Sequence, residues 1–201
     1  MKKLLTSILL FTICISWGQN IHIKYDYNLY GNKIKNEVEV LASDSKVQYI
    51  HNFKKKIIEI EYFQLEQNPK HFINNYNIQE KEFEEYLIEG KNIYKSSWTF
   101  VQDNCEITQE KNKILDYDVI KVSCNGDDKT GKVYLWYTPD IPIPAGPNRY
   151  VGLPGLVLKV TYEKTNTEII AKNIEKKSHL NFINFDNDKI VNVTREELTE
   201  R

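Results

Sequence analysis

The 201-residue sequence has few of the residues that mark common catalytic and metal sites. Neither HExxH nor CxxC occurs, GxSxG is missing, and the glycines are too dispersed for a phosphate-binding loop. The histidines never stand in pairs at a spacing typical of metal ligands; they are His22, His51, His71 and His179. We therefore expect no metal, no cofactor and no catalytic residue, and hence no enzyme.

The sequence also lacks an excess of charge of one sign and a long apolar run. It has 27 Lys and Arg against 28 Asp and Glu, and without Lys2 and Lys3 the balance is 25 against 28, a net charge of −3. A nucleic-acid-binding protein needs a clustered basic excess, so no nucleic-acid partner is expected. No segment after residue 18 approaches the ~20 apolar residues of a membrane-spanning helix, so the mature chain is expected to have none.

The first 18 residues have the pattern of a secretory signal peptide. Two lysines precede an apolar run from Leu4 to Trp17, and the small residues Ser16 and Gly18 surround a cleavage point. We predict cleavage near Gly18 and a soluble periplasmic or secreted protein. Residues 19–201 are enough for a single domain, which we expect to be β-rich.

Cys105 and Cys124 are the two cysteines of the mature chain. An even number in an oxidising compartment favours a disulfide. If the two were directly opposed in a hairpin, its midpoint would fall between Ile114 and Leu115, whereas the turn-like residues are Glu110–Lys113. The alternative is therefore one or two buried apolar thiols.

Alternating apolar and polar residues predict strands along most of the chain. Ile21 to Leu29 alternate strictly, which is typical of a strand with one wet face. Short turns between the first four strands indicate an antiparallel meander. The further strands are predicted at residues 34–40, 46–51, 57–63, 98–108, 115–124, 132–138, 156–162 and 168–174.

One helix is predicted from Asn77 to Gly90. Asn77 and Glu80 have the spacing of a capping box, and Gly90 is positioned to end the helix. The residues that fall on its apolar face are Phe83, Tyr86 and Leu87. We expect a mainly β fold of the α+β type, in which this helix packs on the concave face of a strongly curved antiparallel sheet or half-barrel. The last residues, EELTER, are predicted to form at most one helical turn.

Five of the six prolines lie between Tyr137 and Val160. Proline lacks an amide hydrogen and favours an extended preceding residue, so residues 138–147 are predicted to form an extended, polyproline-like arm outside the sheet. Ile141 and Ile143 would lie on its buried side. Two reversals follow, and Pro154–Gly155 suits a type II turn with a positive φ at Gly155. The structural signature comprises Pro139, Pro142, Pro144, Gly146, Pro147, Gly152, Leu153, Pro154, Gly155 and Leu156.

Two segments carry a family resemblance. WYTPDIPIPAGPNRYVGLPGLVLKV, residues 136–160, resembles the signature of the GLPGLI family of exported bacterial proteins, whose name-giving string is present as GLPGLV. KILDYDVIKVSCN, residues 113–125, resembles the segment that commonly precedes it, with Cys124 at the position of a recurrent cysteine. Val157 replaces the isoleucine of the string. The resemblance covers residues 115–160 and implies a periplasmic or secreted β-rich protein, but no catalytic or binding residue, because the family has no established activity.

Five residues around the proline arm form a candidate binding edge, since loops held by a rigid framework often carry function. They are Trp136, Tyr137, Asp140, Arg149 and Tyr150. In the alternative interpretation Trp136 and Tyr137 belong to the core, Tyr150 packs under the turn, and Asp140 pairs with Arg149. A second set of aromatic residues lines a lipophilic hollow or simply fills it, namely Tyr25, Tyr27, Tyr49 and Tyr62. Paired carboxylates such as Glu84 and Glu85 are interpreted as solvated.

Three hypotheses about function follow. The first is a carrier that holds an apolar small molecule or lipid between the helix and the sheet. The second is an interaction module whose proline arm docks on an envelope partner such as an outer-membrane transporter. The third, a hydrolase, requires a cleft with convergent polar groups.

Overall fold

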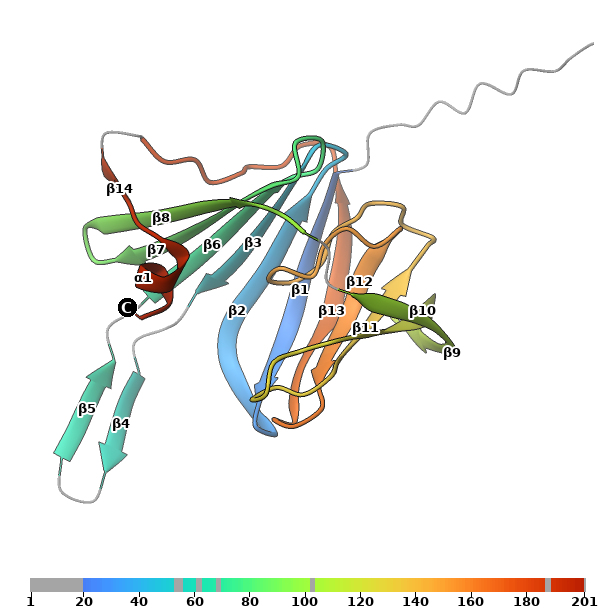
Figure 1. The fold of residues 1–201 in the computed structure, drawn as a ribbon, viewed down its shortest axis with the longest axis horizontal. Helices are drawn as coiled ribbons and strands as arrows, with labels where there is room; N and C mark the ends of the chain where they lie inside the picture. The colour runs from blue at the N-terminus through green and yellow to red at the C-terminus, as the bar shows by residue number, and fades with distance from the viewer. Residues whose placement is uncertain are drawn as a thin grey trace, which may run out of the picture.

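A computed structural model describes residues 20–52, 56–60, 63–67, 70–101, 104–186 and 189–200 (Figure 1). The predicted signal peptide, residues 1–18, lies outside these ranges. The fold is mainly β, as predicted. Its elements are β1 (Asn20–Leu29), β2 (Asn32–Ala42), β3 (Lys46–Asn52), β4 (Lys56–Ile60), β5 (Phe63–Gln67), β6 (Lys70–Asn77), β7 (Glu82–Glu89), β8 (Asn92–Thr99), β9 (Cys105–Ile114), β10 (Tyr117–Cys124), β11 (Val133–Thr138), β12 (Leu156–Tyr162), β13 (Thr167–Lys177), β14 (Ile190–Asn192) and α1 (Arg195–Thr199).

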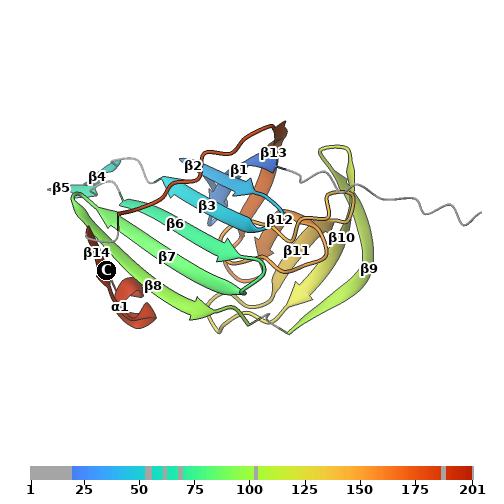
Figure 2. The same ribbon diagram turned by 90° about the horizontal axis from the view of Figure 1, so that it is seen from above.

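Twelve strands form one sheet, in the order β14-β8-β7-β6-β3-β2-β1-β13-β12-β11-β10-β9. Neighbouring strands are antiparallel, except that the edge strand β14 runs parallel to β8. The sheet is open, with β14 and β9 at its edges. It is strongly twisted, so that β6 to β8 run across β10 to β12 (Figure 2). A strongly curved antiparallel sheet or half-barrel was expected. The observed sheet is mainly antiparallel, but it is open.

The predicted meander of four strands is wrong at its fourth member. The range 57–63 spans the end of β4 and the start of β5, and these strands pair with each other as a separate two-stranded sheet. In the main sheet β3 pairs instead with β6, through contacts such as Ile50 with Ile73. The side chain of Tyr62, expected to face inward or line the hollow, lies outside the described residues.

The predicted helix from Asn77 to Gly90 is also wrong, because this range holds the end of β6, a turn and β7. The Asn77 side chain does accept hydrogen bonds from the amides of Gln79 and Glu80, at 3.0 and 3.1 Å, but these stabilise a hairpin turn. Both faces of β7 are covered, so its apolar residues need not alternate. Phe83 and Leu87 face one side of the sheet and Tyr86 faces the other. Because all three are buried, they recur in the sequence at the three- and four-residue spacing that is typical of a helix.

The prediction of one strand from Trp98 to Thr108 is wrong as well. β8 ends at Thr99 and β9 begins at Cys105, and the amide of Phe100 donates to the carbonyl of Lys81 at 2.7 Å. The chain therefore leaves one edge region of the sheet and enters β9 at the opposite edge.

The disulfide between Cys105 and Cys124 is confirmed, with an S–S distance of 2.07 Å. The turn of the β9–β10 hairpin is at Leu115 and Asp116, whose φ angles of 50° and 66° belong to the left-handed region. A register shift between Ile120 and Val122 then brings the two cysteines opposite each other. The turn lay outside the predicted range because Leu115, its first residue, is of a type that rarely adopts the left-handed region.

The 139–155 segment fills the face of the sheet that carries Ile21, Ile23 and Tyr25, here called the inner face. Figure 2 shows this segment between the two crossing parts of the sheet. Ile141 and Ile143 are 3% and 2% exposed and join the main core, as predicted. The segment is not a polyproline helix, however, because the amides of Ile143 and Ala145 donate to carbonyls two residues earlier, at 2.8 and 2.7 Å.

Hydrogen bonds fasten the 139–155 segment to the start of β12. The amide of Leu156 donates to the carbonyl of Ile141 at 3.0 Å, and that of Val157 to the carbonyl of Ala145 at 2.8 Å. The buried hydroxyl of Tyr25 on β1 donates to the carbonyl of Val157 at 2.7 Å. The segment is thus held by the start of β12, which the Tyr25 hydroxyl ties in turn to β1, and it contributes no strand.

Residues 178–186 cross the opposite, outer face, and residues 189–193 lie along the β8 edge (Figure 1); together they are here called the C-terminal strap. Gln48, which is fully buried, exchanges two hydrogen bonds of 2.8 Å with the backbone of Ile183. Leu180 packs in an outer-face cluster with Ile50 and Tyr86. After β14, α1 begins at the capping box of Thr194 and Glu197, and the terminal helical turn that was predicted is confirmed.

Gly155 does not have the positive φ that a type II turn requires, so that prediction is wrong. The left-handed residues of the region are Gly152, with a φ of 85°, and Asn148, with a φ of 56°. Gly155 is needed for a different reason. A Cβ at this position would lie 2.1 Å from the carbonyl oxygen of Thr138 and 2.8 Å from its carbonyl carbon.

We expect Gly155→Ala to lower the free energy of unfolding by about 2 kcal/mol or more, because backbone atoms must move to admit the methyl group. Gly90→Ala is the control, since its φ of 60° is strained for alanine but no atom lies within 4 Å of the added Cβ. Urea unfolding of both variants measures the difference. A Gly155→Ala protein no less stable than Gly90→Ala would contradict the close approach.

Candidate functional site: a cavity on the inner face

The five residues of the predicted binding edge are not gathered on one surface. Trp136 is half-buried, with the Lys121 ammonium 5.8 Å from its ring centroid, whereas its neighbour Tyr137 is buried in the core. Asp140 and Arg149 are exposed. Tyr150 is buried and its hydroxyl donates to that of Tyr162 at 3.1 Å.

A cavity of about 350 Å³ lies on the inner face. Alternate side chains of successive strands point to the same face, so the pairing register brings Tyr49, Asn74 and Glu85 into line across β3, β6 and β7. Three parts of the chain bound the cavity: the sheet, the 139–155 segment through Asn148, and α1 through its last turn. The lining residues are Tyr27, Tyr49, His51, Phe72, Asn74, Glu85, Asn148, Tyr162, Ile169, Leu198 and Thr199.

Hydrogen bonds position several of the polar side chains in the wall. The Asn74 amide donates to the Asn148 side-chain oxygen at 3.2 Å, which ties the 139–155 segment to β6. The Tyr49 hydroxyl lies 3.2 Å from His51 Nδ1, and the Tyr27 ring meets the imidazole edge-on at 5.3 Å between centroids. The wall is therefore a fixed arrangement of rings and amides.

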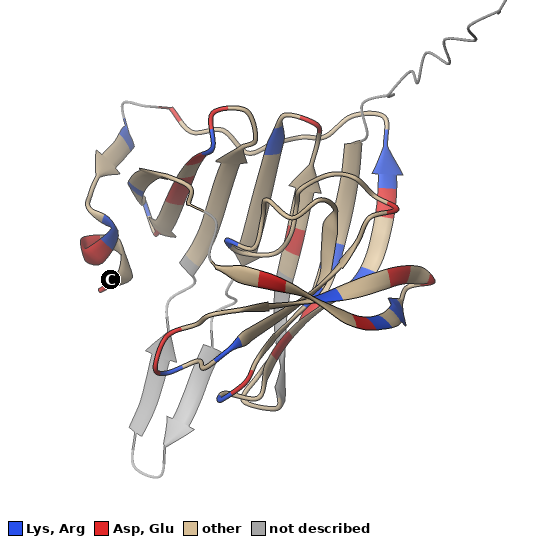
Figure 3. Cartoon of the chain, turned by 45° about the vertical axis from the view of Figure 1, so that its right-hand side comes forward, with Lys and Arg blue, Asp and Glu red and all other residues tan. Residues whose placement is uncertain are grey.

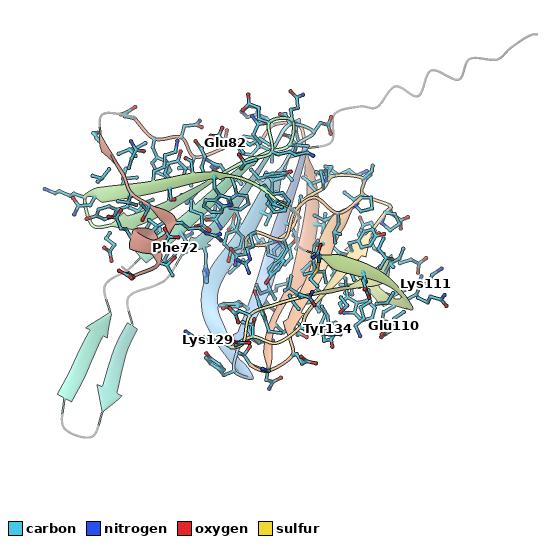
Figure 4. All side chains as sticks on the ribbon, in the orientation of Figure 1. Phe72, Glu82, Glu110, Lys111, Lys129 and Tyr134 are labelled. Atoms are coloured by element: carbon cyan, nitrogen blue, oxygen red, sulfur yellow. A yellow bond between two sulfur atoms is a disulfide. The ribbon has the colours of Figure 1, made fainter. Side chains whose placement is uncertain are left out.

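The apolar part of the wall lies near α1. Leu198 is 5% exposed and is the buried residue of the helix. Phe72, on β6, lines the same cavity and lies beside α1 in Figure 4. At the start of the helix, the Arg195 guanidinium lies 4.4 Å from the ring centroid of Trp98. These contacts fix the helix as one border of the cavity.

Burial favours the uncharged forms of the titratable residues in the cavity. It lowers the pKa of His51 to about 4, so the imidazole is neutral at neutral pH. Burial is also the main cause that raises the pKa of the hydroxyls of Tyr27, Tyr49 and Tyr162. The pKa of the Glu85 carboxyl is raised by burial too, although Arg195 and Arg149 act against the rise.

Glu84 and Glu85 are not the solvated pair that was predicted. They point to opposite faces of β7, and both are half-buried. Of the four tyrosines proposed for the hollow, Tyr27 and Tyr49 line the cavity and Tyr25 fills the core. His51, Asn74, Asn148 and Tyr162 line the cavity without having been predicted to do so. No strand was predicted over β6, which carries Asn74, and the wrong helix concealed the inner-face position of Glu85.

Another cavity, of about 400 Å³, is lined by polar and charged residues, among them Lys46, Glu80 and Glu84. Lys and Arg are interspersed with Asp and Glu over the strands (Figure 3). Within the described ranges, no group of three or more His, Cys, Asp or Glu side chains is placed to hold a metal ion. In the same ranges no helix is long and apolar enough to span a membrane.

The burial of His51 predicts a loss of stability on acidification. Its pKa of about 4 in the folded protein lies below the ordinary value of 6.5, so the unfolded chain binds the proton first as the pH falls. The free energy of unfolding should fall between pH 6.5 and 4, by up to ~3 kcal/mol from this residue. Urea unfolding should show that His51→Gln removes this part of the pH dependence.

The control for that experiment is His179→Gln, which replaces an exposed histidine. It should leave the pH dependence of the unmodified protein in place. If the difference in stability between the unmodified protein and His51→Gln stays constant from pH 6.5 to 4, the interpretation of a buried neutral imidazole is wrong.

The chain matches one family profile, described as "Protein of unknown function (Porph_ging)", over residues 70–159. This range begins with β6 and ends within β12, so it contains the 139–155 segment and both cysteines. It contains Asn74, Glu85 and Asn148 of the cavity but not Tyr27 or His51. The match is thus to a family of unknown function, as the sequence resemblance implied. No curated protein matches the chain.

Two crystal structures of PNGF-II have a similar fold. The structure in space group C2 has a TM-score of 0.66 and 22% identity, and covers 90% of this chain and 32% of PNGF-II. The structure in space group P21 has a TM-score of 0.68 and 19% identity, and covers 90% and 33%. The chain therefore spans about a third of the length of PNGF-II, and at these identities the likeness shows the fold alone.

Proposed function

We propose that the protein is a non-enzymatic binding module that takes one small, uncharged organic molecule into the inner-face cavity. The observation that carries the proposal is a cavity of about 350 Å³ bounded by three separate parts of the chain. Its volume is at the lower end of the range for ligand sites, and its wall combines rings with a few polar groups, as such sites do.

The chemistry of the wall favours an uncharged ligand. At neutral pH the imidazole of His51 and the hydroxyl of Tyr49 carry no charge, and they can only exchange hydrogen bonds with a guest. A lipid tail would leave the Glu85 carboxyl, and the donors and acceptors that Asn74 and Asn148 do not use on each other, facing apolar groups, which is costly. We therefore favour a ligand that has both apolar and hydrogen-bonding groups over the lipid that the carrier hypothesis suggested.

A hydrolase has less support. Both mature cysteines are joined in the disulfide, and the described lining of the cavity contains neither a serine nor a cysteine that could act as nucleophile. The lining histidine is held neutral by burial and is paired with the Tyr49 hydroxyl in the wall. These features support a site that binds without reacting.

Export through the signal peptide of residues 1–18 is part of the proposal. The disulfide supports an oxidising compartment, and the periplasm or the extracellular space provides one. Docking of the 139–155 segment on an outer-membrane protein is the second function we consider. It has less support, because Ile141, Ile143 and Leu153 are buried and leave mainly the exposed Pro139, Pro142 and Pro154 for a partner.

The test is native mass spectrometry of the protein recovered from the envelope of its host. We expect a chain that begins near Gln19, carries one disulfide and retains a small molecule of defined mass. Ile169→Trp should abolish retention, because Ile169 lines the cavity and a larger side chain fills it.

Ile170→Trp is the matched control, since the next residue of β13 points to the other face of the sheet. It should retain the same molecule as the unmodified protein. Protein that never carries a small molecule, or Ile169→Trp protein that carries it as well as the control, would refute the binding function.

A further inference from the structure

Glu85 lies in the middle of β7, on the inner face and in the wall of the cavity. Its backbone pairs with that of Asn74 on β6 and Ser96 on β8. Both of these neighbours are buried, at 5% and 4% exposure. A carboxyl group is thus fixed on a central position of a paired strand rather than on a flexible loop.

The neighbouring residue Glu84, on the same strand, has a carboxyl group that is paired within the protein. It points to the outer face, forms an ion pair with Lys95, and accepts hydrogen bonds from the Tyr86 hydroxyl at 3.0 Å and the Asn75 amide at 3.4 Å. These partners hold its pKa below the ordinary value, although burial acts in the opposite direction. Glu84 therefore has its charge and hydrogen-bond partners within the protein.

Glu85 has no such partners. Within the described ranges, no group donates a hydrogen bond to its carboxyl and no lysine or arginine forms an ion pair with it. A half-buried acceptor without a donor is unfavourable, and the cavity is the open side from which a donor can approach.

Two arginines stand on the segments that border the cavity. Arg149 belongs to the 139–155 segment and Arg195 to α1, both are exposed, and both act electrostatically on Glu85. A cationic ligand would meet these two positive charges, and an anionic ligand would meet the carboxyl of Glu85. A ligand with a neutral N–H or O–H donor avoids both penalties.

We infer that Glu85 determines the ligand class, by accepting a hydrogen bond from a neutral amide or hydroxyl donor whose apolar part lies against Phe72, Ile169 and Leu198. This inference rests on the proposed binding function and adds the polarity and the chemical group of the ligand. It also explains why the strand carries two adjacent carboxyls of which only one is paired within the protein.

The test uses two small probes of similar shape, benzamide and N,N-dimethylbenzamide, titrated into ¹⁵N-labelled full mature protein. Benzamide has a neutral N–H donor, and the dimethyl compound has none. We expect benzamide to bind about tenfold more tightly, the ratio that one hydrogen bond to a carboxylate can provide. The amide resonances that shift should include those of Asn74, Glu85 and Ser96.

Glu85→Leu removes the acceptor and should make the two affinities equal, while the dimethyl compound still binds. Glu85→Gln, which changes the side chain less, should reduce the ratio and serves if the leucine variant does not fold. Glu84→Gln is the matched control on the other face, and it should keep the tenfold ratio even if the protein is less stable.

The outcomes separate the two proposals. If both probes bind the unmodified protein equally, or Glu85→Leu keeps the preference, the role of Glu85 is refuted while the binding module stands. If neither probe binds in the cavity, while the protein from the envelope still carries a small molecule, only the inferred ligand class is wrong. If no small molecule is found there either, both proposals fail.

Discussion

The docking of the 139–155 segment onto the inner face is the contact on which the rest of the structure depends. Its prolines cannot donate to a strand ladder, so the segment cannot enter the sheet. It is buried instead through Ile141, Ile143 and Leu153, and its backbone is paired with the start of β12. The bond from the Tyr25 hydroxyl to the Val157 carbonyl ties the start of β12, to which the segment is fastened, to β1.

The cavity is a consequence of this docking and of the path of the C-terminus. The 139–155 segment covers the part of the inner face over β1, β12 and β13, and its Asn148 reaches Asn74 on β6. The C-terminal strap, held by Gln48 on the outer face, turns around the β8 edge and places Leu198 on the inner face. The space left between the two segments is lined by side chains of the sheet that neither one covers.

Much of the fold could be predicted from the sequence, because strict alternation fixes β1 and prolines exclude residues 139–155 from the sheet. β7 could not be predicted, since burial on both faces replaces alternation with a spacing that resembles a helix. The position of Gly155 depends on the carbonyl of Thr138, a contact that no local pattern encodes. Of the residues that line the cavity, Tyr27 and Tyr49 were predicted from the sequence. The other walls depend on the order of the strands and on the return of the C-terminus to the inner face, which no local sequence pattern encodes.

The central claim, that the 139–155 segment is an integral part of the core and creates the cavity, is tested most directly by native-state hydrogen exchange. The amides of Leu156 and Val157 donate to Ile141 and Ala145 of that segment. If the segment is integral, both amides should exchange only through global unfolding, with the same free energy as the central strands β1 and β12. Exchange of these two amides at the rate of exposed loop residues would contradict the account.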